Sequence, residues 1–335
     1  MEVSRGWKFV KLEFGNYVQS LVADFASMTV TYVDQAKFKL LLDALRTNSL
    51  PVTDIIYTGY GRVTDDNWTR LHAIMEALEQ NNIVKSLTIS CGFVADEGSK
   101  PFFKKLASPQ CKLQKLCIGT KITVKRAILL KKALKKNKSI QALQLSSNTP
   151  PVLGLLKTNT TITLLSVGRT TFDSETIKSL KANRTLEIVR FELADPPAIS
   201  TNVNKRDALF RALSSIGSLT TVAVDLSGGR NWSMKPLAEV VKGNPRLAHL
   251  KIFAEKEIVD AFADVDALGQ ALAQQQSLKS LDLSHSIVPI LKPLKNTSSL
   301  EEITLSLYAH MKYPWFGGVL TSITYVRSEV SIFSQ

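Results

Sequence analysis

The first feature of this sequence that could do chemistry is a concentrated positive charge. Residues 100–138 contain thirteen Lys and Arg and no Asp or Glu, and the Lys and Arg elsewhere balance the 29 acidic residues, so the whole net charge of +13 lies in this segment. Such a segment could bind phospholipid headgroups, nucleic acid or an acidic protein. Nucleic acid is disfavoured, because no exposed aromatics are interleaved for base stacking and no known binding motif is visible. A helix face that is only solvated is the alternative reading.

Other candidate sites in the sequence do not have the residue spacing that their chemistry requires. Residues 227–233 (Ser-Gly-Gly-Arg-Asn-Trp-Ser) resemble a phosphate loop in position but lack its Lys-Ser/Thr ending. Asp260, Asp264 and Asp266 do not follow the spacing of a calcium loop. No CxxC or HxxxH pair suggests zinc, and no nucleophile motif is visible. We therefore expect no catalytic residue, no metal and no cofactor, and predict that the chain is not an enzyme.

Cysteine usage and targeting signals bear on the compartment. Three cysteines are too few for a disulfide framework, and an odd number suits a reducing environment. No stretch of about 18 apolar residues and no secretory signal is visible. Without such a signal, six N-x-S/T sequons count as repeat consensus and not as glycan sites. These features predict a cytoplasmic protein.

The elements that position side chains recur along the chain. A pattern of apolar, two variable, apolar, one variable and apolar residues returns at intervals of about 27 residues. Its nine strong copies begin at Val84, Leu113, Ile140, Ile162, Leu186, Leu219, Leu247, Leu278 and Leu300, and weaker copies begin at Val52 and Leu320. Alternating apolar residues of this kind predict one short strand per copy.

A second periodicity precedes each strand. An apolar residue stands six positions before every strong copy, and an amide stands three positions before seven of the nine. These amides are Asn81, Gln110, Asn137, Asn159, Asn183, Asn244 and Gln275. A polar amide at a helix end can satisfy backbone groups that lack a partner there, so we predict one helix before each strand, ending at the amide.

The combined pattern, as in Leu134-Lys-Lys-Asn-Lys-Ser-Ile-Gln-Ala-Leu-Gln-Leu145, resembles the leucine-rich repeat of the ribonuclease-inhibitor-like class. The resemblance covers about residues 50–325. It departs from the family at the position that usually carries Asn or Cys after the strand, where only Asn148 fits. The resemblance implies an α/β solenoid of ten to eleven repeats, a horseshoe with a parallel β-sheet on its concave face and helices on its convex face.

Solenoid ends need caps, because open ends would expose core and strand edges. We expect an N-terminal cap over residues 1–49, made of a β-hairpin from the alternating segments 7–14 and 28–32 and a first helix over 34–48. The repeats would then occupy residues 50–310. The last repeat and a C-terminal cap would occupy residues 311–335.

The repeat register assigns candidate side chains to both faces. The concave face would carry a mixed charged and aromatic surface suited to protein recognition: Arg190, Glu192, Asp225, His249, Lys251, Phe253, Asp282 and Glu302. A helix over 123–137, with its neighbour before it, would carry an anion-binding patch on the convex face: Lys104, Lys105, Lys125, Arg126, Lys131, Lys132, Lys135 and Lys136. An ordinary solvated surface is the alternative for either set.

The predicted function is a non-catalytic scaffold that binds a protein partner on the concave face. Repeat-only chains of this kind resemble intracellular regulators, and also the leucine-rich-repeat effectors that bacteria deliver into the host cytosol. The alternative is a peripheral membrane or anionic-ligand-binding protein that uses the convex basic patch within residues 100–138.

Overall fold

The computed structural model of the chain divides into two compact units, Met1–Ile162 and Thr163–Gln335. It describes residues 27–30, 35–58, 66–90, 98–120, 122–146, 150–170, 172–193, 201–226, 233–253, 265–284, 294, 299–307 and 321–326. The predicted strand over 7–14, the turn residue Asn148, the loop residues 227–232 and two of the three clustered aspartates, Asp260 and Asp264, lie outside these residues.

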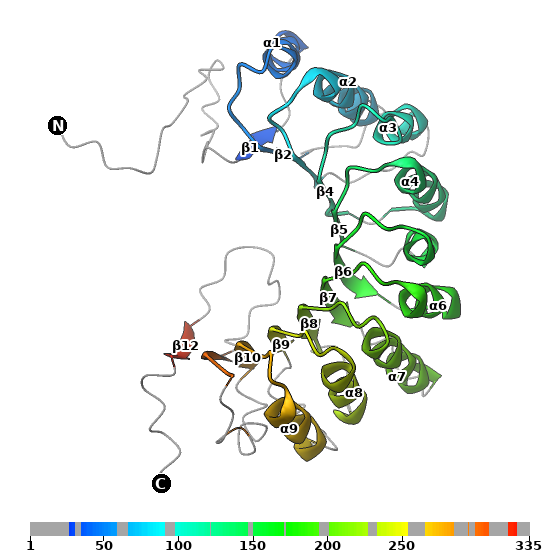
Figure 1. Ribbon diagram of the computed structural model, residues 1–335. Helices are drawn as coiled ribbons and strands as arrows, with labels where there is room; N and C mark the ends of the chain where they lie inside the picture. The colour runs from blue at the N-terminus through cyan, green and yellow to red at the C-terminus, as the bar shows by residue number, and fades with distance from the viewer. Residues whose placement is uncertain are drawn as a thin grey trace, which may run out of the picture. The chain divides into compact units, whose positions relative to one another are not determined.

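The first unit alternates strands with helices (Figure 1). Its elements are β1 (Ser27–Val30), α1 (Gln35–Arg46), β2 (Asp54–Tyr57), α2 (Asp66–Gln80), β3 (Ser86–Ile89), α3 (Ser99–Leu106), β4 (Lys115–Ile118), α4 (Val124–Lys136), β5 (Ala142–Leu145), α5 (Pro150–Leu153) and the 3₁₀ helix η1 (Gly154–Lys157). Strands β1 to β5 pair in parallel in chain order, and helices α1 to α5 pack successively against one another.

The second unit follows the same plan. Its elements are β6 (Leu164–Thr170), α6 (Ser174–Ala182), β7 (Ile188–Leu193), α7 (Thr201–Ser214), β8 (Thr221–Asp225), α8 (Lys235–Gly243), β9 (His249–Phe253), α9 (Val265–Gln274), β10 (Ser280–Ser284), β11 (Glu302–Leu307) and β12 (Thr321–Val326). Strands β6 to β11 pair in parallel in chain order. In each unit, parallel strands stacked in chain order with a helix between most pairs make an α/β solenoid, which confirms the predicted fold class.

The apolar repeat residues form the core between sheet and helices. The strand leucines Leu87, Leu116 and Leu143 are fully buried in the first unit, as are the helix residues Leu106 and Leu130. Burying such a side chain contributes about 1.5–3 kcal/mol. One strand and one helix cannot bury their own apolar faces, so each repeat is stable only when it packs against its neighbours.

The recurring amides satisfy backbone groups at the helix ends, as predicted, and the structure shows that they also join successive repeats. Buried Asn81 donates from Nδ2 to the carbonyl of Leu45 at the end of the preceding helix, and its Oδ1 accepts from the amides of Ile83 and Val84. Asn137 makes the same bonds to Leu106 and to residues 139 and 140. Asn159, Asn183, Asn244 and Gln275 make all or part of the same set. Gln110 differs because its side chain is exposed.

The end strands differ in direction. β1 covers part of the predicted segment 28–32 and pairs in parallel with β2, and the predicted first helix is α1. β12 pairs antiparallel to β11, with Tyr325 opposite Ile303. The copy that begins at Leu320 was predicted as a further repeat, and this is wrong for its strand direction. The alternation of side chains that marks a strand is the same in both directions.

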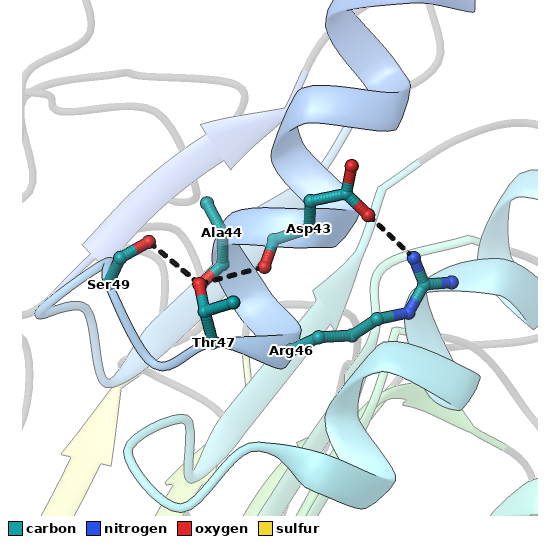
Figure 2. Close-up of polar contacts among 5 residues, drawn as sticks. All are labelled: Asp43, Ala44, Arg46, Thr47 and Ser49. Atoms are coloured by element: carbon teal, nitrogen blue, oxygen red, sulfur yellow. Dashed lines mark hydrogen bonds and ion pairs between the residues drawn. The ribbon is translucent and has the colours of Figure 1, made fainter.

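The first repeat ends in a compact polar turn. Thr47 Oγ1 donates to the carbonyl oxygen of Asp43 over 2.9 Å and lies 3.1 Å from Ser49 Oγ, and Arg46 pairs with the Asp43 carboxylate (Figure 2). The carbonyl oxygen of Asp43 also accepts from the backbone amide of Thr47, so the side chains of Thr47 and Arg46 reinforce the last turn of α1. Asn48 follows in the left-handed region (φ 55°) and accepts from the amide of Asn82 in the next repeat.

Candidate functional site

The candidate site of the second unit is the face of its sheet turned away from the buried strand residues, called here the outer sheet face. On β7, buried Val189, Phe191 and Leu193 alternate with exposed Arg190 and half-buried Glu192. The same alternation on β8 to β11 puts the predicted site residues on this face: Asp225, His249, Lys251, Phe253, Asp282 and Glu302. The register therefore groups all eight predicted residues on one sheet.

The pairing arranges these residues in rows across the strands. Arg190, Ala223, Lys251, Asp282 and Thr304 follow one another in one row. Neighbours in such a row lie about 4.8 Å apart through the backbone. The small Ala223 thus separates the two cations, and Lys251 has a carboxylate beside it.

Lys251 is held in place by two contacts. Its ammonium forms an ion pair with Asp282 and lies 4.4 Å from the centroid of the Phe253 ring. The Asp282 side chain is only 16% exposed, which screens the pair less than open solvent would. A cation over an aromatic face adds about 0.5–1 kcal/mol at a partly exposed site. These two contacts therefore restrict the conformations that the Lys251 side chain can adopt.

Carboxylates gather at the edge of this group. Glu192 and Asp225 are register partners on β7 and β8, and Asp225 pairs in turn with Phe253 on β9. Both carboxylates are half-buried. Two acidic side chains on neighbouring strands beside an aromatic ring suit a cationic group of a partner.

The last row of the face is the most exposed. His249 pairs with Ser280, and Ser280 with Glu302; both His249 and Glu302 are exposed. Thr304 Oγ1 donates to the Glu302 carboxylate over 3.3 Å. Ser280, Ala223 and Thr304 lie on the same face, as do Ile188 and Thr221 in the row of His249. They were missed by sequence reasoning that selected only charged and aromatic types, although the register contained them.

The predicted basic patch of the first unit is reduced by the structure. Exposed lysines of the expected set are Lys104 on α3 and Lys125, Lys132, Lys135 and Lys136 on α4; Lys131 is half-buried. Lys105 instead bonds to α2, with Nζ 3.0 Å from Glu79 and 3.6 Å from Glu76. The hydrogen bond to Glu79 raises the pKa of Lys105, and its charge is largely compensated.

Arg126 was predicted to lie on the outside of this helix, and this is wrong. Its side chain is fully buried, and its guanidinium lies 5.2 Å from the centroid of the Trp68 ring on α2. The reason is helical spacing, because Arg126 stands four and eight positions before the core residues Leu130 and Leu134. A long side chain can bury its stem and still place its head on an aromatic ring.

Two exposed apolar side chains lie on the same helix. Val124 is 69% exposed and Ile128 is 42% exposed, and they lie one turn apart on α4. Leu40 on α1 is the other large apolar residue exposed among the described residues. The sequence reasoning missed Val124 and Ile128 because it considered only the lysines outside the core positions. Their place opposite Leu130 on the helical wheel is the signal that could have found them.

The described thiols are unsuited to nucleophilic chemistry. Cys111 and Cys117 are free and buried, and burial raises the pKa of both thiols. A raised pKa keeps a thiol protonated at neutral pH, whereas the thiolate is the reactive form. Within the described ranges, no three His, Cys, Asp or Glu side chains come together as metal ligands. A search of the same ranges for membrane-spanning helices finds none of sufficient length and apolar character.

No protein-family model and no curated protein sequence matches the chain. Among solved structures it is similar to LegL7, a leucine-rich repeat-containing protein from Legionella pneumophila, with a TM-score of 0.49 and 15% identity over 83% of this chain and 90% of that one. Actin-binding site 2 of leiomodin-1 gives a TM-score of 0.31 and 19% identity, covering 53% of this chain and 88% of that chain. A protein from Bacteroides fragilis gives a TM-score of 0.35 and 12% identity, covering 85% of this chain and 75% of that chain. These likenesses concern the fold alone.

Proposed function

We propose that the chain is a non-catalytic scaffold that binds a protein partner on the outer sheet face of its second unit. The observation that carries the proposal is the grouping of the eight side chains defined above on neighbouring strands β7 to β11. Arg and aromatic residues dominate the binding energy of protein interfaces, and flanking charges of both signs set specificity.

The arrangement favours a protein over a small ligand. Its charged groups are spread along five strands, so a partner must extend across about 20 Å to meet them all. The side chains stand on paired strands whose backbone is fixed by hydrogen bonding. A surface that is ordered before binding loses little entropy on association, as the ion pair of Lys251 illustrates.

Affinity capture with matched variants tests the proposal. Arg190→Ala, His249→Ala and Phe253→Ala are combined in one variant. The control combines Thr88→Ala, Lys115→Ala and Gln144→Ala on the corresponding sheet positions of the first unit. We expect a protein that is captured by the wild type and the control and lost from the first variant. If all three chains are folded by circular dichroism and capture the protein equally, the outer sheet face is not the binding site.

The proposal includes a cytoplasmic site of action. Support comes from the two buried free thiols, Cys111 and Cys117, which a reducing compartment would keep reduced. The resemblance to delivered bacterial effectors extends the proposal to the cytosol of a host cell. Fractionation of infected cells would test that part, because the chain should be recovered in the host cytosolic fraction and not with the bacteria.

A further inference from the structure

The outward side of α4 combines exposed apolar and basic residues, and is called here the α4 outer face. It consists of Val124, Lys125, Ile128, Lys132, Lys135 and Lys136. The core positions Ala127, Leu130 and Leu134 occupy the opposite side of the helix. The two apolar side chains lie in the first two turns, and the lysines are concentrated in the last two.

Among the described residues packed beside this face, the charge of its lysines is not compensated. No Asp or Glu occurs anywhere between residues 98 and 172. On the helices packed beside α4, exposed Lys104 stands on α3 and exposed Lys157 at the end of η1. On α2, Glu76 and Glu79 lie against Lys105 of α3.

A bilayer with anionic headgroups fits both properties of the face. Lysines gain free energy near such a surface, and apolar side chains on the same side of a helix enter the boundary between headgroups and acyl chains. Exposed Val124 and Ile128, in the first two turns of the face, would add nothing to contacts with the phosphates of a nucleic acid, and base stacking needs aromatic side chains that this face lacks. An acidic protein would account for the lysines of the face but not for its exposed apolar side chains.

We propose that the α4 outer face docks onto an anionic lipid surface, with Val124 and Ile128 in the headgroup region and Lys125, Lys132, Lys135 and Lys136 on the lipid phosphates and carboxylates. Because Debye screening at physiological salt acts over about 8 Å, the attraction is short-ranged and sensitive to ionic strength. This interaction is separate from binding at the outer sheet face.

Vesicle sedimentation of the full chain tests the proposal. The probes are phosphatidylcholine vesicles with and without phosphatidylserine. One variant carries Lys132→Glu and Lys135→Glu, and its control carries Lys178→Glu and Lys181→Glu, two exposed lysines with the same spacing on α6. A second variant carries Val124→Ser and Ile128→Ser, with Leu40→Ser as its control for loss of an exposed apolar residue.

We expect wild-type binding only to vesicles with phosphatidylserine, and a clear loss on raising salt from about 0.1 to 0.5 M. Loss of two lysine charges should weaken partitioning of the chain onto the vesicles at least about thirtyfold, and the charge reversal in the α4 variant should weaken it further. Partitioning of the α6 control should stay within about fivefold of wild type. The Val124 and Ile128 variant should bind about tenfold more weakly at unchanged net charge.

Three results would overturn the proposal. Equal binding to both vesicle types would show that no anionic surface is recognised. Equal loss in the α4 and α6 charge variants would assign binding to net charge and not to this face. Absence of vesicle binding, together with retention of single-stranded RNA by the wild type and by the Val124 and Ile128 variant, would assign the lysines to nucleic acid.

Discussion

The guanidinium of Arg126 lies 5.2 Å from the centroid of the Trp68 ring, inside the junction of α2, α3 and α4. Trp68 itself lies 5.7 Å from Phe102 and 5.9 Å from Phe103 between ring centroids. One buried cation and three aromatic rings therefore connect three consecutive repeats. A residue that the sequence suggests is a surface charge instead belongs to the packing of the first unit, and the exposed basic set of α4 consists of lysines alone.

Replacing Arg126 should therefore affect stability more than any lysine of α4. Arg126→Ala removes the ring contact and leaves a cavity, and we expect the free energy of unfolding to fall by about 2–4 kcal/mol. Arg126→Met keeps the volume and avoids burying a charge, so its cost should stay under about 1.5 kcal/mol. Urea unfolding measures both, with Lys125→Ala as an exposed control within about 0.5 kcal/mol. Equal effects of Arg126→Ala and Lys125→Ala would contradict the buried contact.

The repeat could be predicted from the sequence because its strand pattern and its recurring amide each have a single physical cause. In β5, the apolar residues Leu143 and Leu145 alternate with more polar residues because only one side of the strand is buried. An amide such as Asn137 returns in most repeats because each helix end leaves backbone groups that need hydrogen-bond partners. The direction of β12 could not be predicted, since side-chain alternation is the same in parallel and antiparallel strands. Arg126 was misplaced because residue type was given more weight than helical spacing.

Asn137 should be among the most sensitive polar positions of the first unit. Its side chain donates to the carbonyl of Leu106 and accepts from the amides of Ser139 and Ile140, and it is 2% exposed. Asn137→Ala leaves these buried groups unsatisfied, at a cost of about 2–4 kcal/mol. The measurement is the urea midpoint, compared with exposed Gln141→Ala, which should change little. A tolerated Asn137→Ala would show that these bonds do not hold the repeats together.

Gly243 permits close packing between α7 and α8. A Cβ at this position would lie 2.2 Å from the carbonyl oxygen of Ser214, a backbone atom that cannot turn aside. Gly243→Ala should lower the thermal midpoint strongly, by an amount equivalent to about 2–4 kcal/mol. At Gly119 the nearest atom to an added Cβ is the Ser90 hydroxyl, which can rotate, so Gly119→Ala should cost less. The reverse order of the two effects would contradict the packing.

The two buried thiols should make the first unit sensitive to alkaline pH. Burial raises the pKa of Cys111 and Cys117 in the folded chain, whereas in the unfolded chain they ionise above about pH 8.5. Above that pH the unfolded state binds fewer protons than the folded state, so the free energy of unfolding must fall as pH rises. Urea unfolding between about pH 7 and 10 under reducing conditions should show this fall, and a chain with Cys111→Ala and Cys117→Ala should show a shallower one. Parallel curves would contradict it.

The ion pair of Lys251 and Asp282 allows stability and recognition to be separated. The lysine side chain is 42% exposed, so solvent screening limits the coupling in a double-mutant cycle to about 0.5–1 kcal/mol. Exchanging the charges, with Lys251→Asp and Asp282→Lys together, keeps a pair on β9 and β10 but takes the ammonium away from the Phe253 ring. We expect stability within about 1 kcal/mol of wild type. Because a partner at the outer sheet face meets each charge at a fixed place, the exchanged chain should fail to capture the protein that the wild type captures. Capture by the exchanged chain at wild-type level would mean that the partner does not read the order of these charges, and that binding must be sought elsewhere on the molecule.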